Sequence, residues 1–237
     1  MEVVQPQAVL VDLDDTVIDY SGSVIAAWRA VCDATASEVP GLDAAAFFDA
    51  IARVREWYWS DPERHREGRA DLRAASTRIV DHALRNLGYD LPRLAQTVAN
   101  TYRDFREEAI RLLPGAIDAL ERMRRLGIRL ALVTNGSGPA QRAKIDRFQL
   151  PQHFDHILVE GEFGCGKPDE RVYRAALDAL RTRPHAAWFV GDNLEWDVAA
   201  PQRLGMQAVW VDVTGSGLPA GAAIQPQRII RSLTELF

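Results

Sequence analysis

Cysteine and lysine are scarce in this sequence. Among its 237 residues there are two cysteines, Cys32 and Cys165, which are too few for the disulfide framework of a small secreted protein. Of the 28 basic residues, only Lys144 and Lys167 are lysine, and the other 26 are arginine. Arginine is therefore the default basic residue of this chain, and a cluster of arginines says less about function here than it would elsewhere.

Long apolar runs and an excess of positive charge are also missing. No apolar stretch reaches the roughly 18 residues of a membrane-spanning helix, and no basic-then-apolar leader is present. The net charge of -5 does not favour binding to nucleic acid or to an acidic membrane, since either would call for a basic face. The sequence also lacks internal repeats and low-complexity segments. These features predict a soluble protein of the reducing cytoplasm, without nucleic-acid or membrane partners, and either monomeric or homodimeric.

The chain divides into two parts with different patterns of apolar residues. Residues 21–110 contain no convincing strand and show the apolar spacing of amphipathic helices. The predicted helices of this block are 21–38, 43–59, 71–87 and 91–110, with Asp43 and Asp71 as N-caps. Outside the block, short apolar strands alternate with helices.

The alternating part predicts a parallel sheet. Its expected strands are 9–11, 128–133, 157–159, 187–190 and 208–211, and its expected helices are 114–126, 139–148, 170–180 and 196–204. Continuous apolar strands joined by helices are typical of a doubly wound parallel sheet covered on both faces. We therefore predict an α/β protein whose core domain comprises residues 1–19 and 112–237, with an inserted all-helical domain at 20–111.

Three carboxylates follow the first predicted strand within four positions. Asp12, Asp14 and Asp15 come directly after the apolar run 8–11. Because side chains alternate along an extended segment, Asp12 and Asp14 are expected to share one side while Asp15 faces away. In an open parallel sheet, ligands bind beyond the carboxyl ends of the strands. Two carboxylates aimed at one point repel each other unless a cation or a proton lies between them, so a binding site is favoured over a solvated acidic turn.

Polar residues also follow the other predicted strands. Thr134 and Asn135 end the second strand, Lys167 lies in the loop after the third, and Asp192 follows the fourth with Asp197 five residues beyond. Taken singly, these residues could be a turn, a solvated lysine and a helix N-cap.

Together, the strand-end residues form a set with a chemical use. The carboxylates suit Mg2+, which prefers one or two protein carboxylates together with water and phosphate oxygens. Thr134 and backbone N–H groups at a helix start can bind phosphoryl oxygens. Lys167 would supply a compact positive charge, and its retention in an arginine-rich chain indicates that a point charge is favoured over a planar fork.

Four motifs in order make the chain resemble the haloacid dehalogenase superfamily of aspartate-nucleophile phosphatases. They are Asp12-Leu13-Asp14-Asp15-Thr16 for DxDxT, Thr134-Asn135-Gly136 for the threonine motif, Lys167-Pro168 for the lysine motif, and Gly191-Asp192 to Asp197 for GDxxxxD. The resemblance covers nearly the whole chain. The helical insertion is similar to the C1 cap found in the phosphoglycolate phosphatase and nucleotidase-like members of that superfamily.

The resemblance implies a role for each acid. Asp12 would attack phosphorus and become an aspartyl phosphate, while Asp14 would protonate the leaving oxygen and later activate water. Mg2+ would be held by the Asp12 carboxylate, the Asp14 backbone carbonyl and the Asp192 carboxylate. Asp197 would act on the metal through water or would orient Lys167.

The remaining motif residues are expected to support the site. The resemblance places Thr134, Asn135 and Lys167 around the substrate phosphate. Thr16 is expected to support the first motif's loop by hydrogen bonding. Asn193 stands where some relatives have serine, and we expect it to cap a helix.

The implied reaction is Mg2+-dependent hydrolysis of a phosphomonoester on a small phosphorylated metabolite. Relatives that displace halide lack the second aspartate of the first motif, so Asp14 disfavours dehalogenation. Phosphonate-cleaving relatives use a cap lysine, and residues 21–110 contain none. A sugar-phosphate mutase remains an alternative, as do a receiver-like module and a non-catalytic protein that binds a phosphorylated ligand.

Substrate choice is expected to reside in the helical insertion. Arg53, Trp57, Trp59 and His65 lie in a stretch that mixes aromatic and cationic residues. One interpretation is a pocket in which Trp57 or Trp59 stacks on a sugar or nucleoside and Arg53 or His65 contacts a second anion. The favoured interpretation is that the aromatics form the core of a small helical bundle and the arginines a solvated face.

Overall fold

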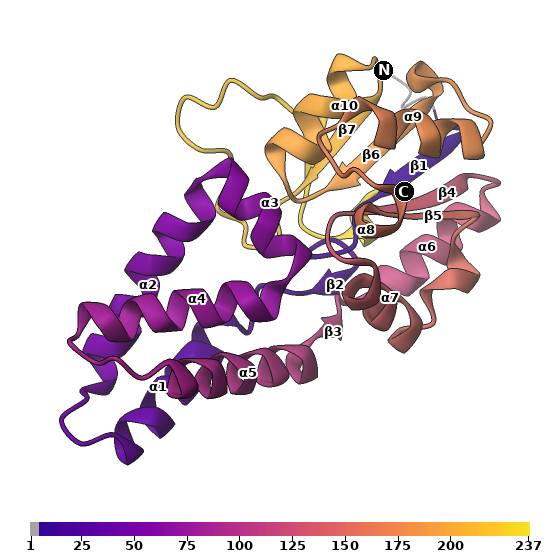
Figure 1. Ribbon diagram of the computed structural model, residues 1–237. Coiled ribbons are helices and arrows are strands. Elements are labelled where there is room, and N and C mark those ends of the chain that lie inside the picture. The colour runs from indigo at the N-terminus through magenta and orange to yellow at the C-terminus, as the bar shows by residue number, and fades with distance from the viewer. Residues whose placement is uncertain (1–4) are drawn as a thin grey trace. The chain divides into compact units, whose positions relative to one another are not determined.

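In the computed structural model, which describes residues 5–237, the chain folds into two units. One comprises the described residues up to Asp19 together with Arg111–Phe237, and the other comprises Tyr20–Ile110 (Figure 1). The second junction lies one residue earlier than the sequence pattern indicates. Arg111 belongs to the first unit because it pairs with Asp19, where β2 (Ile18–Asp19) and β3 (Arg111–Leu112) form a short antiparallel ribbon.

The first unit is built on a six-stranded sheet. Its strands run in the order β5-β4-β1-β6-β7-β8, and every neighbouring pair is parallel. Their bounds are β1 Ala8–Val11, β4 Arg129–Thr134, β5 His156–Val159, β6 Ala187–Gly191, β7 Gln207–Val211 and β8 Arg228–Ile230. The five predicted strands are confirmed, and β8 is an additional edge strand that the sequence pattern did not reveal. The prediction of a doubly wound parallel sheet is correct.

Helices cover the sheet on both faces. Ala8 and Leu10 of β1 pack with Tyr173 on one face, and Val9 and Val11, which alternate with them, are also fully buried. The helices of this unit are α6 Ala116–Arg125, α7 Gly138–Arg147, α8 Glu160–Phe163, α9 Glu170–Ala179 and α10 Ala200–Arg203. Short 3-10 turns occur at Leu150–His153 (η1), Pro184–Ala186 (η2) and Leu233–Glu235 (η4), and a π-helical turn (η3, Leu194–Ala199) leads into α10.

The second unit is a helical bundle with its own apolar core. Its helices are α1 Val24–Glu38, α2 Ala44–Ser60, α3 Pro62–Ala70, α4 Leu72–Asn86 and α5 Pro92–Ala109. Asp43 and Asp71 cap α2 and α4, as predicted, by accepting hydrogen bonds from the backbone N–H groups of Ala46 and Ala74. In the core, the Trp28 ring stacks on Tyr102.

Helix α3 was missed because its composition is strongly polar. Its nine residues include only one buried position, Gly68, so apolar periodicity is absent. The signal that marks it is local: Asp61 caps the helix through the Arg64 N–H, and Pro62 occupies the first turn. Gly68 is needed here because a Cβ atom would come within 2.8 Å of the rings of Tyr58 and Trp59.

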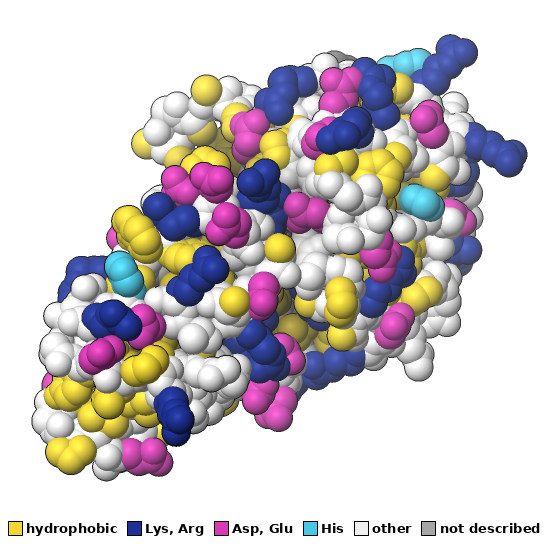
Figure 2. Space-filling view, viewed as in Figure 1, with side chains coloured by type: hydrophobic (Ala, Val, Ile, Leu, Met, Phe, Trp, Pro, Cys, Tyr) yellow, Lys and Arg dark blue, Asp and Glu magenta, His cyan; other side chains and the backbone are white. Residues whose placement is uncertain are grey.

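The surface agrees with the mixed charge of the sequence. On the face drawn in Figure 2, basic and acidic side chains are interspersed and neither sign dominates. Across residues 5–237, no helix combines the length and apolar character needed to cross a membrane.

Candidate active site

The site residues gather where the strand order of the sheet reverses. β1 is central, with β4 on one side and β6 on the other, and all three strands are parallel. Asp12 and Asp14 follow β1, Thr134 ends β4, and Asp192 follows β6. Parallel strands place their carboxyl ends at the same edge, and a crevice opens where neighbouring crossovers turn to opposite faces.

A buried ion-pair cluster lies at the centre of this edge. Lys167 Nζ lies 2.6 Å from Asp12 Oδ1 and 2.7 Å from Asp197 Oδ1. Only 2% of the Lys167 side chain is exposed. Burial alone would lower the pKa of Lys167, but the charges of Asp12 and Asp197 outweigh it and raise that pKa above its usual range, so the lysine stays charged.

The acids around Lys167 outnumber its charge. Burial, followed by the charge of Asp197, raises the pKa of Asp12 to about 7, although Lys167 opposes the shift. Burial, followed by the charge of Asp12, raises the pKa of Asp192 to about 9. One lysine therefore does not compensate the carboxylates of this cluster.

The uncompensated carboxylates are suited to a hard divalent cation. Asp12, Asp192 and Asp197 each offer an oxygen, and these oxygens lie within 4.8 Å of one another. Carboxylate oxygens are the ligands that Mg2+ prefers, and a cation among them would stabilise the charged forms that burial and mutual repulsion disfavour in Asp12 and Asp192. The residues present thus fit a magnesium ion.

Asp197 is held in place by the loop after β6. Its Oδ2 accepts a hydrogen bond from the Asn193 N–H at 3.0 Å, while its other oxygen binds Lys167. The Asn193 side chain caps the following turn, as expected, by accepting hydrogen bonds from the N–H groups of Glu195 and Trp196. Both oxygens of Asp197 are therefore engaged within the protein, which favours a role in orienting Lys167.

Gly191 makes room for Asp197. A Cβ atom at position 191 would lie 2.3 Å from Asp197 Oδ2, closer than any real contact. We expect Gly191→Ala to lower the free energy of unfolding by about 1–3 kcal/mol, the usual effect of overpacking a filled interior. Urea denaturation measures the change in free energy of unfolding. Gly138→Ala is the control, because a Cβ atom at position 138 meets only the flexible Glu162 side chain, at 3.3 Å. Equal stability of the two variants would contradict this account of Gly191.

Thr134 and Asn135 are placed differently within the site. Thr134 is 2% exposed, and its hydroxyl accepts a hydrogen bond from the Gln141 side chain. The Asn135 amide bonds the Lys167 backbone twice, donating to its carbonyl oxygen and accepting from its N–H, both at 2.7 Å. Asn135 thus joins the loop after β4 to the lysine loop, and Gly166 permits this approach because a Cβ there would lie 2.5 Å from Asn135 Oδ1.

Two residues that the sequence analysis did not assign also belong to the site. Lys144 Nζ lies 2.6 Å and 2.7 Å from the two carboxylate oxygens of Asp14. Gln141 Nε2 lies 3.1 Å from Asp14 Oδ2 and 2.8 Å from the Asn135 carbonyl oxygen, besides the hydroxyl of Thr134, so its two hydrogens are shared among three acceptors. The signal for Lys144 was its rarity, since it is one of only two lysines in the chain.

Two expectations about the first motif need correction. Asp15 was expected to face away, but the backbone leaves the extended conformation after Val11 and Asp15 has a φ of 55°, so alternation does not apply to it. Its charge contributes to the raised pKa of Asp192, which makes it part of the electrostatics of the site. Thr16 was expected to form a hydrogen bond, yet its buried hydroxyl has no partner among residues 5–237.

The aromatic stretch of the second unit is partly core and partly surface. Tyr58 is buried in the bundle, and Trp59 packs against the same cluster, with an edge-on contact to His65. Trp57 is 49% exposed, and its ring stacks on the His82 ring at 5.4 Å and lies 4.0 Å from the Arg64 guanidinium. Arg53 is exposed. The bundle-core interpretation therefore holds for Trp59 but not for Trp57.

Fold and site together define the class of the protein. An α/β fold with carboxylates and a buried lysine at the ends of its central parallel strands is suited to metal-assisted hydrolysis. The chain belongs to the haloacid dehalogenase-like hydrolases, whose family profile matches residues 6–205.

Named relatives include both phosphatases and a dehalogenase. The chain is 39% identical over 162 residues to phosphoserine phosphatase of Thermus thermophilus, covering 68% of this chain and 63% of that protein. It is 27% identical over 207 residues to glyceraldehyde 3-phosphate phosphatase of Pyrococcus abyssi, covering 86% of this chain and 80% of the relative. It is 33% identical over 158 residues to (S)-2-haloacid dehalogenase of Pseudomonas sp. strain YL, covering 65% of each.

A solved structure shares the fold over nearly the full length. The HAD-hydrolase YfnB from Bacillus subtilis, solved with magnesium bound, matches with a TM-score of 0.74 at 22% identity, covering 98% of this chain and 97% of its own. At that identity the likeness shows the common fold.

Proposed function

We propose that the protein is a phosphomonoester hydrolase that acts on a small phosphorylated metabolite through an aspartyl-phosphate intermediate. The observation that carries this proposal is the buried cluster in which Lys167 binds Asp12 and Asp197 beside Asp192. The phosphatases among the relatives support it. The two free cysteines are consistent with the cytoplasm as the expected location.

In the first step, Asp12 is the nucleophile. One of its carboxylate oxygens attacks phosphorus, the bond from phosphorus to the ester oxygen breaks, and Asp14 gives that oxygen a proton. Lys167 stays charged and close to Asp12 Oδ1, which reduces the repulsion between the carboxylate and an incoming phosphate. Thr134 lies at the end of β4, where its hydroxyl and nearby backbone N–H groups can bind phosphoryl oxygens.

In the second step, water replaces the protein oxygen on phosphorus. Asp14, now a carboxylate, takes a proton from water as water attacks, and Asp12 leaves as a free carboxylate with release of inorganic phosphate. The carboxylates of Asp12 and Asp192 and the backbone carbonyl of Asp14 would hold Mg2+, which when bound supplies positive charge that neutralises the phosphoryl oxygens.

A phosphate-release screen tests the proposal. Phosphoserine, glyceraldehyde 3-phosphate, sugar phosphates, nucleoside monophosphates and p-nitrophenyl phosphate would each be offered with Mg2+, and again with a chelator. We expect release that requires the metal and returns when Mg2+ is restored. Release of chloride from 2-chloropropionate, measured in parallel, is expected to be absent because Asp14 has no use with a halide leaving group. Absence of phosphate release from every ester would overturn the proposal.

Asp14→Asn tests the acid-base assignment. The amide can neither protonate the leaving oxygen nor accept a proton from water, so we expect turnover to fall by roughly 10²- to 10⁴-fold. The loss should be larger for alkyl phosphates than for p-nitrophenyl phosphate, whose leaving group needs little protonation. Steady-state rates with both esters measure it, and unchanged rates with both would refute the role of Asp14.

A further inference from the structure

Helix α7 presents two side chains to the carboxylate of Asp14. Gln141 and Lys144 are three residues apart, so they lie on the same face of the helix, one turn from each other. Both are buried, with 3% and 8% of the residue exposed. We refer to Gln141 and Lys144 together as the Asp14 clamp.

The clamp leaves the Asp14 carboxylate little freedom. Lys144 Nζ contacts both carboxylate oxygens, at 2.6 Å and 2.7 Å, and Gln141 adds a donor to Oδ2 at 3.1 Å. The Asp14 side chain is 25% exposed, so without these donors it could turn toward water. A general acid acts only within hydrogen-bond reach of the atom it protonates, and a displacement of about 1 Å can reduce the rate about 10²-fold.

The clamp also ties Asp14 to the phosphate-binding end of β4. The two hydrogens of the Gln141 amide are shared among the Thr134 hydroxyl, the Asn135 carbonyl and the Asp14 carboxylate. One side chain therefore contacts both the expected acid and the residue expected to bind the phosphate. Its position fixes the distance between the two.

The rarity of lysine indicates that position 144 has a specific requirement. Only two of the 28 basic residues are lysine, and both contact a carboxylate of the first motif, Lys167 at Asp12 and Lys144 at Asp14. A buried ammonium is unfavourable unless negative charge compensates it, and Asp14 supplies such charge through both of its oxygens. An arginine at this position would place a larger, planar guanidinium beside Asp14, which would displace the carboxylate from the position that it has against the compact ammonium of lysine.

We propose that Lys144 is a positioning residue for the reaction, which holds the Asp14 carboxylate toward the leaving oxygen with the help of Gln141. This inference rests on the proposed function, because it assigns Asp14 the acid-base role. In this proposal Lys144 acts through Asp14, whose carboxylate oxygens it contacts.

Lys144→Met is the primary test, because methionine keeps the length of the side chain and removes the donor. We expect kcat/KM for an alkyl phosphate to fall about 10²-fold. With p-nitrophenyl phosphate, whose leaving group needs little protonation, the fall should be several-fold at most. Gln141→Met should change the ratio of kcat/KM for the alkyl phosphate to kcat/KM for p-nitrophenyl phosphate in the same direction, but by a smaller factor. This variant replaces Lys144→Met as the test if Lys144→Met does not fold.

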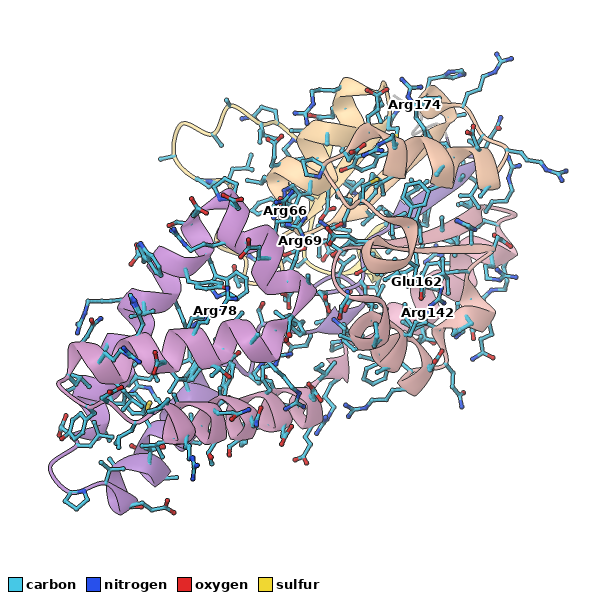
Figure 3. All side chains as sticks on the ribbon, in the orientation of Figure 1. Arg66, Arg69, Arg78, Arg142, Glu162 and Arg174 are labelled. Atoms are coloured by element: carbon cyan, nitrogen blue, oxygen red, sulfur yellow. The ribbon has the colours of Figure 1, made fainter. Side chains whose placement is uncertain are left out.

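A double-mutant cycle separates positioning from a general effect on structure. If Lys144 acts through Asp14, the Lys144→Met change should have little further effect in an Asp14→Asn background. Arg142→Met is the matched control: Arg142 is on the same helix but pairs at the surface with Glu162 of α8, and Figure 3 labels the two residues close together. It should leave both kcat/KM values unchanged.

The outcomes distinguish this inference from the proposed function. An unmodified protein that releases no phosphate from either ester overturns the proposed function and this inference with it. An active protein in which Lys144→Met leaves the ratio of the two kcat/KM values unchanged overturns only the inference. The inference is also overturned if Lys144→Met lowers kcat/KM by the same factor in the Asp14→Asn background as in the unmodified protein.

Discussion

Asp12→Asn is expected to reduce phosphate release more than about 10⁴-fold, the largest effect of any single change in this protein. The amide oxygen is a poor nucleophile toward phosphorus, and without the attack no aspartyl phosphate forms. The change also removes a charge that Lys167 contacts at 2.6 Å, so that of its two ion pairs among residues 5–237 the lysine would keep the one with Asp197. Phosphate release from p-nitrophenyl phosphate with saturating Mg2+ is the measurement.

The control for this variant is Asp178→Asn. Asp178 is exposed on α9, and we expect its amide variant to retain full activity. Circular dichroism would verify that Asp12→Asn keeps its fold. Mass spectrometry of protein quenched during turnover should find an added phosphoryl group on the unmodified protein and none on Asp12→Asn. Turnover by Asp12→Asn within tenfold of the unmodified rate would contradict the nucleophile assignment.

The sequence alone was sufficient to predict the sheet and most residues at its edge. Asp12, Thr134 and Asp192 each come at or directly after the end of an apolar strand, and parallel strands bring such ends together whatever the details of packing. The place of these residues therefore followed from strand order and direction, which the alternation of strands and helices reveals.

The features that the sequence did not predict depend on details of packing and backbone conformation, which the pattern of apolar and polar residues does not contain. Lys144 and Gln141 come from the body of α7, where contact with Asp14 depends on how the helix is rotated against the sheet. The side of Asp15 depends on a left-handed backbone after the strand has ended, which strand alternation cannot describe. β8 is a three-residue edge strand with two exposed positions, and its sequence lacks a continuous apolar run.

Asp192→Asn is expected to have two opposite effects. It should remove a proposed magnesium ligand and lower the activity by about 10²-fold or more, because a ligand of the ion is lost along with its charge. In the absence of metal it should make the protein more stable at neutral and alkaline pH. The reason is that Asp192 lies buried beside Asp12 and Asp197, whose charges disfavour its own.

The sign of the pH dependence follows from the raised pKa. Asp192 has a pKa of about 9 in the metal-free folded protein, against about 3.9 for an aspartate in an unfolded chain. As pH rises between these values, the unfolded chain releases a proton that the folded protein keeps. The free energy of unfolding of the metal-free protein therefore decreases through this window. Asp12, with a pKa of about 7, contributes in the same direction up to that pH.

Asparagine at position 192 has no proton to release, so its variant should lose less stability as pH rises. At pH 8, with chelator present, we expect Asp192→Asn to exceed the unmodified protein by about 1–3 kcal/mol in free energy of unfolding. At pH 5 the difference should be smaller. Adding Mg2+ to about 100 times its Kd should stabilise the unmodified protein by about 2.7 kcal/mol and the variant by much less.

Urea denaturation at pH 5, 6.5 and 8, with chelator or with Mg2+, measures both effects, and Asp178→Asn again serves as the control. If the metal-free curves of the unmodified protein and Asp192→Asn ran parallel over this range, folding would not raise the pKa of Asp192, which would contradict the burial and repulsion described for it. Stabilisation of both proteins by Mg2+ to the same extent would place the metal elsewhere. We therefore expect the carboxylates of Asp12, Asp192 and Asp197 to destabilise the metal-free protein. Bound metal should remove this cost, and the proposed reaction needs the same carboxylates.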